Sequence, residues 1–164
     1  MRTLPVVLVF AVVIAAFAPV TAADQPVVSQ YPVSGSGVWS DMCPFSVYLE
    51  TSANVVERQF FDKSGALTMT HMHWVEQDTF SANGKSLIGV PYTFNIQFLF
   101  DSSGNITRLV IDGILEKVPL PDGKLFMTVG RYDVVGNGFP AGPVWVPDKG
   151  ATVNLDGFCA ALAP

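Results

Sequence analysis

The clearest hydrophobic pattern in the chain is a strict alternation over residues 92–100. Tyr92, Phe94, Ile96 and Phe98 are aromatic or aliphatic, and the positions between them are mostly polar. Successive side chains of a β-strand point to opposite faces, whereas a helix would scatter these rings around its circumference. The pattern therefore predicts a strand with one buried aromatic face and one face toward water.

Turn-forming residues recur along the chain and divide most of it into short β-rich segments. Each turn supplies a Gly or Asn able to take a positive φ between two apolar-rich strands. The four predicted turns are Asp62–Gly65, Ser81–Lys85, Asp101–Asn105 and Pro121–Lys124. The strands predicted around them cover residues 45–51, 55–61, 67–80, 92–100, 105–111 and 124–135. Because the apolar parity changes within residues 67–80, we expect a bulge near His71 to Trp74.

Sequential hairpins in a chain of this length predict an all-β fold with a single antiparallel meander. We expect the meander to close into a small β-barrel of about six to eight strands, because closure removes the exposed edges. A β-sandwich is the alternative. Residues 24–42 are rich in Pro, Ser and Gly, so they are expected to form an extended N-terminal lead-in to a barrel domain over residues 43–164. A short helical turn is expected around residues 158–162.

The N-terminus has the pattern of a secretory signal peptide that is cleaved after Ala23. It holds a single positive charge, an apolar run over residues 4–18, and a small residue at Thr21. A retained anchor helix is the alternative, but Pro5 and Pro19 interrupt the segment. We therefore expect residues 1–23 to be removed and the protein to be secreted, with no membrane contact after cleavage.

Charge and motifs exclude several functional classes. The formal net charge is −5, and the nine Lys and Arg residues are scattered. A basic patch that could neutralise phosphates is therefore not expected, so neither nucleic acid nor an anionic membrane surface is a predicted partner. A nucleophile elbow and a phosphate-cradling loop are missing from the sequence, so we assign no catalytic residue and no cofactor.

The chain has two cysteines, Cys43 and Cys159. In an oxidising compartment an even number of cysteines favours a bridge, and two separate buried thiols are the alternative. A bridge across more than a hundred residues would stabilise the fold by about 4 to 5 kcal/mol on the chain-entropy model. It would also hold the C-terminal tail against the first strand.

Several short motifs together resemble a group of uncharacterised secreted bacterial proteins. The barrels of that group are similar to those of allene oxide cyclases and lipocalins. The resemblance implies a small lipocalin-like barrel with a disulfide, and it carries over no catalytic residue. The motifs are Cys43-Pro44-Phe45, Gly84-Lys85-Ser86, Gly130-Arg131 and Phe158-Cys159-Ala160-Ala161-Leu162.

The candidate ligand-binding residues are Tyr92, Phe94, Phe98 and Arg131. The three rings could line a cavity for an apolar ligand, and a filled core is the alternative. An inward-facing Arg131, paired with Glu116 or Asp133, would indicate a ligand that carries a carboxylate. The alternative for Arg131 is a surface ion pair.

His71 and His73 are weak candidates for a metal site. Residues i and i+2 of a strand share a face, so both imidazoles could bind one metal ion. A zinc site would need a further ligand, which Glu76 or Asp78 could supply only if a bulge turns it to that face. Two exposed strand histidines without a metal are the alternative.

These features favour non-catalytic binding of a small apolar or amphipathic molecule. The first alternative is a cavity-based isomerase or cyclase that uses Arg131, Glu116 or a histidine. The second is an extracellular interaction protein with a solid core.

Overall fold

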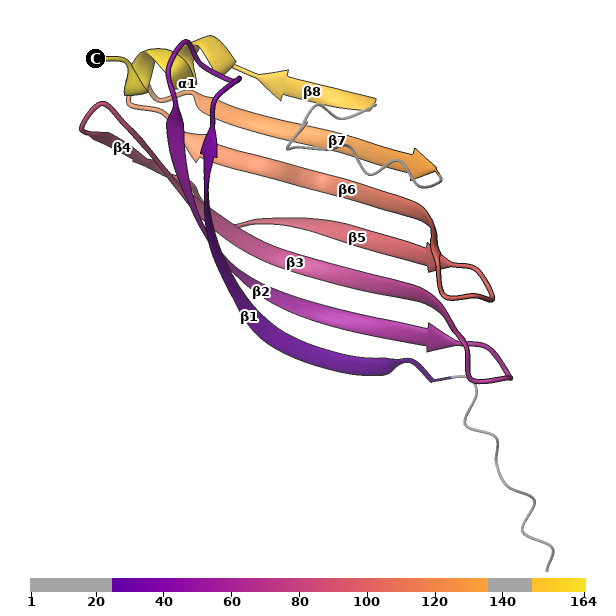
Figure 1. Ribbon diagram of the computed structural model, residues 1–164. Coiled ribbons are helices and arrows are strands. Elements are labelled where there is room, and N and C mark those ends of the chain that lie inside the picture. Colours follow the sequence, from indigo (N-terminus) through magenta and orange to yellow (C-terminus); the bar gives the residue numbers. More distant parts are fainter. Residues whose placement is uncertain (1–24, 136–148) are drawn as a thin grey trace, which may run out of the picture.

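One antiparallel β-sheet with a short helix at one end makes up the fold (Figure 1). The computed structural model describes residues 25–135 and 149–164, so the expected signal peptide lies outside the described residues. The pairing order is β1-β2-β3-β5-β6-β7-β8, and β4 pairs with β3. The elements are β1 (Val27–Trp39), β2 (Val47–Phe61), β3 (Leu67–Ala82), β4 (Lys85–Ile88), β5 (Tyr92–Phe100), β6 (Ile106–Pro119), β7 (Leu125–Val135), β8 (Lys149–Val153) and α1 (Leu155–Leu162). The predicted all-β antiparallel sheet is confirmed.

Local sequence explains most of these elements. β5 has the bounds that its alternation predicts. All four predicted turns are present, and each contains a glycine with a positive φ, such as Gly84 at 75° beside Asn83 at 51°. Such φ values suit the tight turn of a two-residue hairpin. The helical turn expected near the C-terminus is also confirmed, as α1.

Two strand predictions are corrected by the pairing. Residues 45–51 and 55–61 do not form separate strands, because β2 runs without a break from Val47 to Phe61. The bulge expected near His71 to Trp74 is wrong, since β3 stays in register with both β2 and β5 there. The register between β2 and β3 shifts instead at the start of β3, opposite Phe60 and Phe61. β3 is flanked by strands on both sides. Apolar side chains occur on both of its faces, so the apolar positions change from odd to even along the sequence without a bulge.

The segment expected as a lead-in is extended, but it belongs to the sheet. It forms β1, which pairs with β2 over its whole length, from Val27 opposite Gln59 to Trp39 opposite Val47. Pairing uses backbone groups, so the small and polar side chains of this segment do not prevent it. β1 is an edge strand, where a residue such as Pro32 is tolerated.

The sheet curls strongly but is not closed into a barrel. β1 and β8 lie at the two ends of the pairing order, and no pairing joins them within the described residues. The end of β1 and the start of β2 rise over the sheet toward α1 (Figure 1). The expected barrel closure is therefore not confirmed, and the curled strands create an inner face that is covered at one end.

A disulfide and an aromatic core hold this covered end together. Cys43 and Cys159 are bonded, with their Cα atoms 5.5 Å apart, as predicted. The core beneath the bridge includes Trp39, Phe80, Phe126 and Phe158, and the last three are fully buried. The ring of Phe158 packs against Phe126 at 4.4 Å and against Phe80 at 5.2 Å. The helix is therefore anchored to the sheet by packing as well as by the covalent bond.

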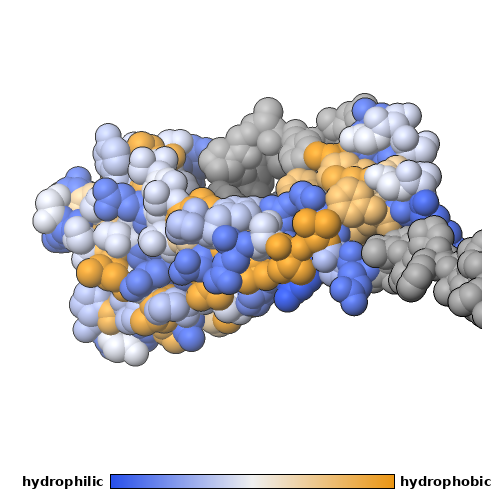
Figure 2. Space-filling model, turned by 90° about the horizontal axis from the view of Figure 1, so that it is seen from below, coloured by the Kyte–Doolittle hydropathy of each residue, from blue (hydrophilic) through white to orange (hydrophobic). Residues whose placement is uncertain are grey.

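Apolar side chains on the outside are interspersed with polar ones. Figure 2 shows a band of apolar residues on the underside of the molecule, interrupted by hydrophilic residues. Large exposed apolar side chains include Val27, Val28 and Ile88. Within the described ranges, no helix is long and apolar enough to cross a membrane.

Candidate functional site: a cavity on the inner face

The curled sheet surrounds a cavity of about 330 Å³. This volume lies at the lower end of the range for small-molecule sites. The walls come from five strands, β1, β2, β3, β5 and β6. The lining side chains are mostly apolar or small, and they are Val33, Gly35, Ser36, Gly37, Trp39, Leu49, Thr51, Trp74, Glu76, Phe94, Ile96, Leu115 and Glu116.

Two glycines of β1 leave open space in the wall of the cavity that this strand forms. Val33, Gly35, Gly37 and Trp39 alternate along β1, and all four line the cavity. A Cβ atom added at Gly35 or Gly37 would meet no other atom within 4 Å. Larger residues at these two positions would project into the open space. The cavity therefore exists partly because β1 lacks side chains there.

The opposite wall is aromatic. Trp74 and Phe94 pair directly across β3 and β5, and their rings stack 5.6 Å apart with an interplanar angle of 15°. Tyr92 lies 6.1 Å from Phe94 and is buried. Of the three rings proposed from the sequence, Phe94 lines the cavity, Tyr92 reaches its polar end through the hydroxyl group, and Phe98 lies further along the same face of β5.

A cluster of three carboxyl groups forms the polar end of the site. Asp78 is almost fully buried, and the hydroxyl of Thr51 donates to its Oδ1 at 2.7 Å. The hydroxyl of Tyr92 lies 2.7 Å from Oε1 of Glu76 and is also in hydrogen-bond contact with Oδ2 of Asp78. Glu116 is 5 % exposed and forms a hydrogen bond with Asp78.

Hydrogen counting shows that the cluster must hold at least one acid proton. The phenol of Tyr92 has a single hydrogen, so it can donate to only one of its two carboxyl partners at a time. In the other contact the carboxyl group must carry the proton. Burial raises the pKa of Glu76 to about 7, and the nearby Asp78 acts in the same direction. Burial also raises the pKa of Glu116 well above its usual value.

Two buried polar atoms of the cavity lining have no hydrogen-bond partner among the described residues. They are Oε2 of Glu116, an acceptor when ionised, and Nε1 of Trp74, a donor. Buried polar groups are nearly always satisfied, so each such atom needs an explanation. A polar ligand in the cavity would provide one.

The sequence contains a signal for this cluster in β3. Trp74, Glu76, Asp78 and Phe80 alternate, so they share the inner face of β3. Two carboxylates between two inward aromatic residues indicate a buried acidic site. The roles predicted from the sequence are different: Glu76 and Asp78 as metal ligands, and Glu116 as a partner of Arg131 or as the polar group of an isomerase.

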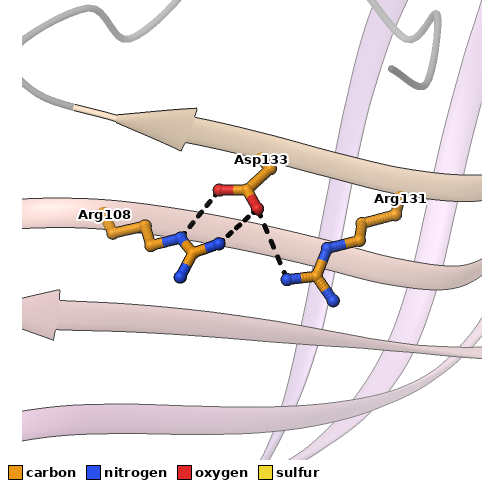
Figure 3. Close-up of polar contacts among 3 residues, drawn as sticks. All are labelled: Arg108, Arg131 and Asp133. Carbon is orange, nitrogen blue, oxygen red and sulfur yellow. Dashed lines mark hydrogen bonds and ion pairs between the residues drawn. The ribbon is translucent and has the colours of Figure 1, made fainter. Parts of the chain in front are cut away.

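Arg131 does not take part in the site. Its side chain is 49 % exposed and lies 3.4 Å from Asp133, and Nε of Arg108 donates to the same carboxylate at 2.8 Å (Figure 3). The expected inward orientation with Glu116 as partner is therefore wrong, and the surface ion pair is what the structure shows. The hydrogen bond from Arg108 lowers the pKa of Asp133 to about 2.

The two histidines lie away from the carboxyl cluster. His71 and His73 occupy odd positions of β3, so they share the face opposite to Glu76 and Asp78. Nδ1 of His73 lies 3.0 Å from Oδ1 of Asn95 on the neighbouring strand. Burial and then the charge of Arg58 lower the pKa of His71. Within residues 25–135 and 149–164, no group of three His, Cys, Asp or Glu side chains could hold a metal ion.

Comparison of the chain with protein-family models, with curated proteins and with solved structures finds no match. Function must therefore be inferred from the cavity and its chemistry.

Proposed function

We propose that the protein is a secreted binding protein that holds a small amphipathic molecule in the cavity of its inner face. The observation that carries this proposal is the combination of an apolar, aromatic-walled cavity of about 330 Å³ with convergent buried polar groups at one end. This combination is typical of small-molecule sites. The apolar part of the ligand would lie against Trp74 and Phe94, and its polar part against Glu76 and Glu116.

Export forms part of the same proposal. The N-terminal pattern is that of a signal peptide, and the bridge between Cys43 and Cys159 is of the kind that persists in oxidising compartments. The resemblance to lipocalin-like barrels supports the same proposal, as an analogy of shape. Binding does not require a closed barrel, because the curled strands β1 and β2 already form one wall of the cavity.

A second candidate function is acid–base isomerisation in the same cavity. It is favoured by Glu76, whose pKa of about 7 suits proton transfer near neutral pH, beside the hydroxyl of Tyr92. In this alternative Glu76 would take a proton from the substrate and return it at another carbon atom.

Calorimetric titration of the disulfide-bonded protein with 1-octanol tests the binding proposal. We expect saturable binding that is lost in Gly37→Leu, because the new side chain fills the cavity from β1. Ser34→Leu adds the same side chain on the opposite face of β1 and should leave binding unchanged. Absence of binding in the wild-type protein, or equal binding by both variants, would overturn the proposal.

Incubation with an unsaturated ketone separates binding from catalysis. Recovery of the unchanged ketone after prolonged incubation supports a binding protein. Conversion of an unsaturated ketone to its positional isomer, abolished by Glu76→Gln, would support the isomerase instead. Glu50, an exposed carboxylate on β2, supplies the matched control Glu50→Gln.

A further inference from the structure

The polar end of the cavity carries an unbalanced set of acidic groups. Glu76 and Glu116 line it, and Asp78 is hydrogen-bonded behind them. None of the thirteen lining residues is Lys, Arg or His. A ligand at this end therefore meets acceptors and negative charge but no basic side chain from the lining.

Glu116 is the lining residue that most directly indicates a bound ligand. It is 5 % exposed and lines the cavity, and its Oε2 has no hydrogen-bond partner among the described residues. Burial favours the protonated form of Glu116 in the ligand-free protein, and a charged donor beside Oε2 would favour the ionised form instead, because a charge-assisted hydrogen bond is about twice as strong as a neutral one. A protonated amine supplies both the hydrogen and the charge.

The aromatic wall next to the carboxyl groups suits the same chemistry. Trp74 and Phe94 lie stacked beside Glu76, and Trp39 lines the cavity from β1. Aromatic faces attract cations within about 6 Å of the ring centroid, and Trp does so most strongly. They also bury the alkyl part of an amphipathic ligand.

We propose that the ligand is an organic cation: an apolar body of about ten non-hydrogen atoms with a protonated amine that binds between Glu76 and Glu116. This inference rests on the proposed function, since it names the chemistry of the molecule held in the same cavity. Fatty acid anions are excluded by repulsion from the carboxyl cluster. A neutral alcohol fits the apolar wall but lacks the charge of the amine, so it binds more weakly.

Binding of such a cation competes with protons. The ionisable groups that face Glu116 are Glu76 and Asp78 from β3 and Tyr92 from β5, while β1 and β2 contribute none to the cavity lining. Burial raises the pKa of Tyr92, so this phenol stays neutral. Glu76, with a pKa of about 7, gains its charge between pH 5.5 and pH 8. The amine stays charged throughout, so its affinity rises with pH.

Calorimetry with three ligands of equal chain length tests this inference: n-octylamine, 1-octanol and octanoate. At pH 8 we expect octylamine to bind about tenfold more tightly than octanol, as one charge-assisted hydrogen bond provides, and octanoate to bind least. At pH 5.5 the octylamine affinity should fall about tenfold, whereas octanol affinity should change little. Glu116→Gln should remove the preference for octylamine and keep octanol binding, with Glu50→Gln as the control.

The outcomes separate this inference from the proposed function. Equal affinities for octylamine and octanol, an octylamine affinity that does not rise with pH, or tightest binding of octanoate would overturn the cation assignment. In each of these cases the binding proposal would stand. Binding of none of the three ligands would overturn both.

Discussion

Leu115 and Glu116 are neighbours in β6, yet both side chains are buried and both line the cavity. Consecutive residues of a regular strand point to opposite faces. The pairing of β6 with β7 shifts between Ile114 and Glu116, which marks a bulge at this point. A bulge adds one residue to the strand and re-aims the side chains that follow it. It is therefore the bulge that brings a carboxyl group into an apolar cavity.

The first prediction concerns the pH dependence of stability that this buried carboxyl group causes. The folded state raises the pKa of Glu116, so it keeps a proton that the unfolded chain releases above pH 4.5. Stability therefore falls as pH rises above that value. Glu116→Gln keeps a neutral hydrogen-bond donor toward Asp78. It should therefore raise the free energy of unfolding at pH 8 by about 1 kcal/mol or more, and the increase at pH 5 should be smaller. Urea denaturation at the two pH values measures the difference.

Glu50→Gln is the matched control for that measurement, because Glu50 is exposed on β2. We expect it to change stability by less than about 0.5 kcal/mol at either pH. A Glu116→Gln variant that is less stable than the wild-type protein at pH 8 would show that the carboxylate is stabilised in the fold, contrary to this account.

The second prediction concerns the bridge between Cys43 and Cys159. These residues are 116 positions apart, so the bridge restricts most of the unfolded chain. On the chain-entropy model its removal lowers the free energy of unfolding by about 5 kcal/mol. Denaturation of the Cys43→Ala/Cys159→Ala variant should show this loss, and reductant should destabilise only the wild-type protein. A loss below about 1 kcal/mol would mean that packing of α1 alone holds the covered end.

The sequence predicted the parts of the fold that depend on local chemistry. The alternation of Tyr92, Phe94 and Ile96 indicated β5 and its inward aromatic face, and Phe94 and Ile96 do line the cavity. Turn residues such as Gly84 marked the hairpins because positive φ restricts the choice of amino acid. The pairing of the two cysteines was predicted from their even number and from the signal-peptide pattern at the N-terminus.

Apart from the disulfide, features that depend on partners distant in sequence were not predicted. β1 forms because β2 offers its edge, and its own composition of Ser, Gly and Pro resembles that of a loop. The turn of Glu116 toward the cavity depends on the register between β6 and β7, which the sequence of β6 alone does not specify. Arg131 was expected inside because its immediate neighbours did not reveal which face of β7 is covered.

The third prediction concerns the aromatic core under the helix. Phe158 is fully buried between Phe126 and Phe80, so its truncation leaves a large cavity. We expect Phe158→Ala to lower the free energy of unfolding by about 3 to 5 kcal/mol. Phe61→Ala, at a position that is 36 % exposed, should cost far less. Equal losses for the two variants in chemical denaturation would contradict the packing described for α1.

The fourth prediction concerns the close contact between β5 and β6 behind the aromatic wall. Gly113 pairs with Phe94, has a φ of 132°, and a Cβ added there would lie 2.7 Å from the Cα of Phe94. Because that neighbour is backbone, the contact can be relieved only if the two strands separate. Gly113→Ala should therefore lower the free energy of unfolding by about 2 kcal/mol or more.

The same change should also weaken ligand binding, since Phe94 forms the wall of the cavity. Gly35→Ala is the matched control for stability alone, because its added Cβ meets no atom within 4 Å. It should leave stability within about 0.5 kcal/mol of the wild-type value. Thermal denaturation of the two variants measures stability, and octanol titration compares Gly113→Ala with the wild-type protein. If Gly113→Ala proves as stable as Gly35→Ala and binds octanol as tightly as the wild-type protein, then β5 and β6 do not approach each other as closely as described, and the aromatic wall lacks the support assigned to it.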